Sequence, residues 1–176
     1  MNRSNTGLEW HRLHRFLCAV RPGHLQQATL AQGILTGTLV AAATAGALLG
    51  FGIQQGMPAR PFNAVASLLL GDRAEGIWGF HLVVTVVGMI THAVLSFGWG
   101  LLFARVAGGM RGLRLAASAL IVAALAMAVH VILATRILDA HVSDVLAPPQ
   151  VIALHVVLGI ALAVGMRFAT SYPLKS

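Results

Sequence analysis

Four long apolar runs constrain the fold of this chain more than any other feature. They cover about residues 30–53, 78–104, 113–135 and 149–168. A helix needs about 20 apolar residues to cross the hydrocarbon core of a bilayer, and each run is long enough to supply a span. Charged residues are only 10% of the chain, whereas soluble domains carry about 25%. The mean hydropathy of +0.81 agrees, so the sequence predicts an integral membrane protein and excludes a soluble domain.

Short polar connections between the runs favour an all-α fold, an antiparallel four-helix transmembrane bundle. Runs of β-branched residues lie inside apolar segments that are too long for strands. We expect three parts: a cytoplasmic interfacial segment at 1–27, the four-helix transmembrane domain at 28–170, and a cytoplasmic tail at 171–176.

Two segments outside the runs also have helical patterns. Residues 8–20 carry apolar side chains at helical spacing with Arg12 and Arg15 off that stripe, which predicts an amphipathic helix on the membrane surface. After the first run, Pro61 suits the first turn of a helix too short to span. We expect this second segment to cap the outer end of the bundle as an interfacial or re-entrant helix.

The positive charges lie mostly on one side of the expected topology. Nine of the 12 lysines and arginines belong to the N-terminal segment, the second connection and the tail, and Arg60, Arg73 and Arg136 remain on the other side. Positive loops stay in the cytoplasm, so both termini are predicted there, in a multi-pass inner-membrane protein. The net charge of +7 reflects this bias, and no nucleic-acid partner is expected.

Four histidines, His81, His92, His130 and His155, lie within or at the ends of the apolar runs. A polar ring at membrane depth needs a hydrogen-bond partner, a metal, a cofactor or a water-lined path. Counting residues from the ends of the runs places His81, His130 and His155 about 5 to 9 Å from the outer boundary. These three could hold a haem or a transition metal, although hydrogen bonds between helices are the favoured explanation and no cofactor is favoured. His92 falls past the middle of the bilayer.

Helical periodicity suggests a second arrangement. His81 and His92 are eleven residues apart, about three turns, and Thr85 and Ser96 fall on the same face. This face predicts a polar seam inside the bundle, or a path for protons or a small solute.

Two weaker patterns complete the set of candidate residues. Asp139, His141 and Asp144 could bind a cation in the third connection. Small residues at close helical spacing favour tight packing of helices in lipid. The glycines expected to pack are Gly33, Gly37, Gly46, Gly50, Gly88 and Gly159.

Several stretches resemble a group of small, functionally uncharacterised bacterial inner-membrane proteins with four spans. They are PFNAVASLLLGDRA, the set His81, Gly88 and His92, the run Phe97-Gly98-Trp99, and LHVVLGIALAVGMR. The likeness covers roughly residues 30–167. It implies a fold and a location in the inner membrane, and it implies no activity.

The sequence contains no GxSxG motif, no phosphate-binding glycine loop and no carboxylate pair within a run, so enzymatic chemistry is not favoured. We expect a non-catalytic accessory or stabilising subunit of a larger membrane complex, in contact with the bilayer and with a membrane-protein partner or another copy of itself. The alternatives are a haem- or metal-binding membrane protein and a proton or solute path.

Overall fold

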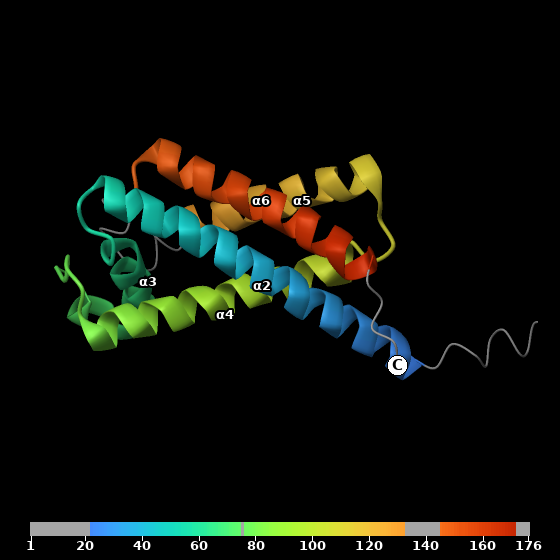
Figure 1. The fold of residues 1–176 in the computed structure, drawn as a ribbon, viewed down its shortest axis with the longest axis horizontal. Coiled ribbons are helices and arrows are strands. Elements are labelled where there is room, and N and C mark those ends of the chain that lie inside the picture. The colour runs from blue at the N-terminus through green and yellow to red at the C-terminus, as the bar shows by residue number, and fades with distance from the viewer. Residues whose placement is uncertain (1–21, 75, 133–144, 172–176) are drawn as a thin grey trace, which may run out of the picture.

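The computed structural model describes residues 22–74, 76–132 and 145–171, with side chains from residue 29 onward. These parts are helical and contain no strand, which confirms the predicted all-α class. The elements are α2 (Pro22–Gln54), α3 (Arg60–Leu70), the short 3-10 helix η1 (Gly71–Arg73), α4 (Leu82–Val106), α5 (Gly112–Ile132) and α6 (Pro148–Ser171) (Figure 1). The expected surface helix at 8–20 and the cation candidates Asp139, His141 and Asp144 lie outside the described residues.

Four of these helices are long and apolar enough to cross a membrane, as the sequence predicts. They are Thr29–Gln54 within α2, then α4, α5 and α6. Each one exposes large aliphatic side chains, for example Ile53, Val94, Ile121 and Ile160. Such surfaces would aggregate in water, whereas lipid tails cover them without cost.

Helix α4 begins at Leu82, four residues after the predicted start of its run. The amide of Asn63 in α3 donates to the carbonyls of Ile77 (2.8 Å) and Gly79 (2.9 Å), so these carbonyls are satisfied outside a helix. His81 then serves as the N-cap, with an extended backbone and a ring nitrogen, Nδ1, that accepts from the N–H of Val84 at 3.4 Å.

Helix α2 packs against both α4 and α6 (Figure 1). Early residues of α2 contact late residues of its neighbours. A Cβ atom added to Gly37 would lie 2.8 Å from the Cα of Phe97, and one added to Gly165 would lie 3.0 Å from the Cα of Thr36. Glycine therefore lets these backbones approach closely enough to pack without a hydrophobic driving force.

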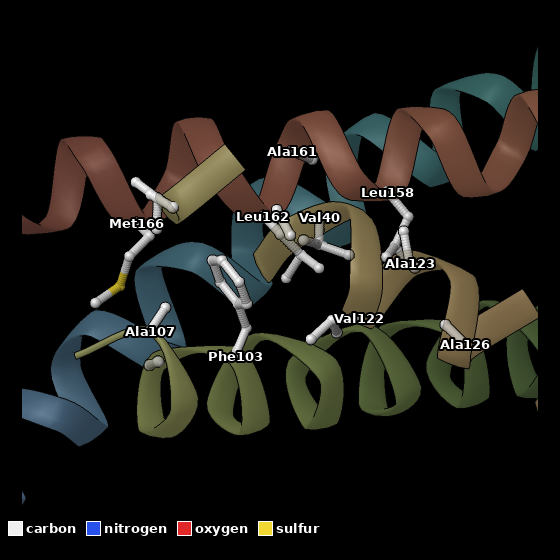
Figure 2. Close-up of a cluster of buried hydrophobic side chains, with 13 residues drawn as sticks. Val40, Phe103, Ala107, Val122, Ala123, Ala126, Leu158, Ala161, Leu162 and Met166 are labelled. Atoms are coloured by element: carbon white, nitrogen blue, oxygen red, sulfur yellow. The ribbon is translucent and has the colours of Figure 1, made fainter. Parts of the chain in front are cut away.

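Helix α5 packs on α6 and hardly touches α4. The main apolar cluster joins all four spans, with Val40, Phe103, Leu162 and Met166 fully buried (Figure 2). Because α4 and α5 are held together near their shared turn and otherwise have few contacts, they leave space between them farther along.

Helix α3 is the short helix expected between the first two spans, and Pro61 lies in its first turn. It packs on the first half of α4. A Cβ atom on Gly88 would overlap the carbonyl oxygen of Phe62, so the backbones of α3 and α4 touch at this position. This contact fixes α3 beside the span that carries two of the histidines.

The expected packing glycines divide into two groups. Gly33, Gly37, Gly88 and Gly159 face close neighbours on other helices. A Cβ atom on Gly46 or Gly50 would meet no atom of another element within 4 Å. Periodicity alone singled out neither Gly100 nor Gly165, whose contacts are as close.

Candidate functional site

The space between α4 and α5 forms a cavity of about 560 Å³, a volume typical of small-molecule sites. All five α-helices that the structure describes contribute to its wall, and the wall is mostly apolar. The side chains with polar atoms in this wall are Thr44, His92, Ser96, Trp99, His130 and His155. The cavity thus brings together three histidines from three different helices.

The rim of the cavity consists of exposed apolar side chains. Val94, Leu95 and Leu102 of α4 and Val129 of α5 line the cavity and are also exposed on the outer surface of the molecule. These positions belong to helices that are long and apolar enough to cross a membrane. The cavity is therefore bordered by the exposed apolar surface of α4 and α5, the kind of surface that lipid covers.

His155 of α6 is 7% exposed, and its two ring nitrogens have different surroundings. Nδ1 lies 2.7 Å from the carbonyl oxygen of Val151, one turn earlier in the same helix. A carbonyl oxygen can only accept, so Nδ1 carries the hydrogen and Nε2 of the neutral ring carries a lone pair. No other described residue donates to Nε2, which leaves an acceptor open to the cavity.

His130 of α5 faces His155 across the cavity wall. The two ring centroids are 5.4 Å apart, with an interplanar angle of 63°. Within the described part of the chain, the ring nitrogens of His130 have no hydrogen-bond partner. The pair therefore presents a fixed acceptor on α6 beside a ring on α5 that can donate or accept.

His92 of α4 has a different role. Its Nε2 lies 3.0 Å from Oγ1 of Thr44, and that hydroxyl already donates to the carbonyl of Val40 at 2.6 Å. Thr44 must therefore accept from the Nε2–H of His92. The carbonyl of Ala41 and the ring of Phe62, with its centroid at 6.2 Å, also contact this imidazole. His92 links α4 to α2 at the edge of the cavity.

The expected polar seam on α4 divides into two environments. Thr85 donates to Oδ1 of Asn63 at 2.7 Å and accepts from the backbone N–H of His81 at 3.2 Å, outside the cavity wall. His92 and the buried Ser96 line the cavity instead. The hydroxyl of Ser96 makes no hydrogen bond to another residue that the structure describes.

The structure does not bring together the three histidines that residue counting placed in one layer. His81 is an exposed N-cap outside the cavity wall, and His92 lines the cavity beside His130 and His155. Counting assumed that every helix starts at the same boundary. In the structure α4 starts at Leu82, and α3 packs beside its first half. In the described residues no group of three His, Cys, Asp or Glu could hold a metal ion.

Sequence reasoning missed Asn63. Its side chain is 1% exposed and makes three hydrogen bonds, to the carbonyls of Ile77 and Gly79 and to the hydroxyl of Thr85. The available signal was a single amide in the apolar helix RPFNAVASLLL. An amide buried in such a segment needs several partners, which marks it as a structural centre.

No protein family matches this chain, and no curated protein and no solved structure matches it either. The function is therefore inferred from the cavity and its histidines.

Proposed function

We propose that this chain is a multi-pass membrane protein that binds a lipophilic small molecule in the cavity between α4 and α5, without transforming it. The observation that carries the proposal is the cavity itself, which is about 560 Å³ in volume and mostly apolar. A molecule dissolved in the bilayer can enter the cavity directly through its exposed apolar rim, which consists of Val94, Leu95, Leu102 and Val129.

The proposed topology is an antiparallel bundle in the inner membrane of a bacterium, with both termini in the cytoplasm. Gly33 contacts Leu101 and Gly37 contacts Phe97, so residue numbers rise along α2 as they fall along α4. Thr36 beside Gly165 and Gln55 bonded to Gln150 give the same opposite order for α2 and α6. Exposed Arg105, Arg111 and Arg114 at the turn between α4 and α5 support a cytoplasmic position for that turn.

A bulky substitution at the rim tests whether the cavity binds a ligand. Val129→Trp places an indole at the opening, where the exposed position tolerates its size, and Ile121→Trp adds the same bulk elsewhere on α5. We expect native mass spectrometry after mild extraction to show one small-molecule adduct on the wild type and on Ile121→Trp. Occupancy in Val129→Trp should fall at least tenfold, the factor that a steric conflict of about 1.4 kcal/mol produces. Equal occupancy in all three proteins would contradict the proposal.

We further propose that the protein acts as an accessory subunit of a larger membrane complex. The open face of α2 at Gly46 and Gly50 supports this role, because a second helix could approach closely there. Extraction in mild detergent should recover a stoichiometric membrane-protein partner or a second copy of the chain. Gly46→Ile should release it, whereas Ala117→Ile, on an exposed position of α5, should not. A wild-type protein that is strictly monomeric after native extraction would refute the accessory role.

A further inference from the structure

We propose that the ligand carries a neutral hydroxyl group, a phenol or an alcohol on an apolar body, and that His155 and His130 bind this hydroxyl. The inference rests on the ligand-binding function proposed above and specifies the chemical class of the ligand.

The acceptor nitrogen of His155 sets the first requirement on the ligand. His155 is buried, and its Nδ1–H is already used by the carbonyl of Val151. Its Nε2 lone pair therefore requires a hydrogen-bond donor from whatever fills the cavity. Ketones, ethers and esters have no such donor. They would leave the acceptor buried without a partner, and an unmade hydrogen bond of this kind costs more than a made one gains.

The neighbouring ring of His130 sets the second requirement on the ligand. His130 lies beside His155, with 5.4 Å between ring centroids, and its nitrogens are free of other described residues. A hydroxyl that donates to Nε2 of His155 still has lone pairs on its oxygen, and an N–H of His130 can donate to them. One hydroxyl can thus bond to both rings at once, because it donates to His155 and accepts from His130.

The charge of the cavity wall sets the third requirement on the ligand. The described residues that line the cavity include no Lys, Arg, Asp or Glu. A carboxylate or a phosphate would enter this apolar space without a partner of opposite charge, at a large desolvation cost. A neutral head group therefore suits the described lining of the cavity, and the apolar remainder of the cavity accommodates its body.

Two kinds of membrane compound share this chemistry. One is the reduced form of an isoprenoid quinone, whose head is a hydroquinone, and the other is an isoprenoid alcohol. The probes are an alkyl hydroquinone with its dimethyl ether, and farnesol with its methyl ether. Methylation removes the donor hydrogen and keeps most of the apolar body. The fatty acid of similar length is a third probe, which tests exclusion of an anion.

Binding to the full-length protein in lipid nanodiscs is measured for the wild type, His155→Phe, Val129→Trp and Ile121→Trp. For the wild type we expect at least one hydroxyl compound to bind about tenfold or more tightly than its ether, and the fatty acid to bind more weakly than either. In His155→Phe the preference should fall to about twofold or less. Because the preference is a ratio within one protein, partial loss of folded material in a variant does not affect it.

The outcomes separate the two proposals. If a hydroxyl compound and its ether bind the wild type equally, or if the preference persists in His155→Phe, the head-group assignment is overturned and the cavity function stands. If no probe binds, or if Val129→Trp binds as well as Ile121→Trp, the cavity function fails and the assignment fails with it. A preference confined to one pair supports the proposal and identifies the source of the hydroxyl.

Discussion

Gly100→Ala is expected to lower the melting temperature of the detergent-extracted protein by about 6–12 °C. A Cβ atom on this residue would lie 2.5 Å from both the Cα and the N of Gly37 and 2.8 Å from the carbonyl oxygen of Gly33. All three are backbone atoms, so no side chain can rotate away and the helices must separate. Overpacking costs about 1–3 kcal/mol, and we take the upper end for a contact between two backbones. In a chain of this size each kcal/mol shifts the melting temperature by about 2–4 °C.

The matched control is Gly98→Ala, two residues away on the same helix. Gly98 is exposed, and a Cβ atom there would meet nothing within 4 Å. Alanine should leave the melting temperature unchanged or raise it slightly, since it favours a helix over glycine by about 0.5–1 kcal/mol. If both variants melt at the same temperature, α2 and α4 do not pack at Gly100 as described.

Hydropathy and length predicted the four spans, and the helices follow because the cost of unsatisfied backbone groups in lipid leaves no other form for such runs. The same signals do not show which faces of the helices meet. Gly46 and Gly50 have the same spacing as Gly33 and Gly37, yet only the latter pair touches α4. Glycine spacing shows that a helix can pack closely. Which helix lies against those glycines depends on how all the helices are arranged.

The candidate site depends on information that is even less local. Its cavity exists because α2 lies between α4 and α6 while α5 packs mainly on α6, and no residue pattern encodes this order. Residue counting separated His92 from His130, yet both line the cavity. Asn63, far away in sequence, holds the residues before α4 outside a helix. The bond from His155 to the carbonyl of Val151 is local, and helical geometry could have suggested it. The sequence does not show which of the histidines makes such a bond, nor which of them faces a cavity.

The second large effect is expected from Asn63→Ala, which should destabilise the protein by about 3 kcal/mol or more. The substitution removes three hydrogen bonds, each of which contributes about 0.5–1.5 kcal/mol. It also leaves the hydroxyl of the buried Thr85 without its acceptor, which adds to the loss. Thermal unfolding gives the total loss. Hydrogen exchange should locate it, because the amides of α3 and of residues 76–81 should exchange faster while those of α6 stay protected.

Two matched variants separate the role of Asn63 as a structural centre from the effect of losing any polar side chain. Thr85→Val removes one of the three hydrogen bonds of Asn63 and the one that Thr85 accepts from the N–H of His81. It should cost about 1–2 kcal/mol. Ser67→Ala removes a hydroxyl from the same short helix that bonds only to the carbonyl of Ala64, and should stay within about 0.5 kcal/mol of the wild type. A melting temperature of Asn63→Ala equal to that of Ser67→Ala would show that Asn63 is not a structural centre.

Asn63 also connects stability to the proposed function. Pro61, Ala64, Val65 and Leu68 of α3 form part of the cavity wall, and the hydrogen bonds of Asn63 tie this helix to the residues that precede α4. Asn63→Ala should therefore weaken binding of the hydroxyl compound and of its ether by the same factor, because it disturbs the apolar wall and leaves His155 intact. His155→Phe should instead change their ratio. These opposite patterns distinguish a residue that shapes the cavity from one that recognises the head group.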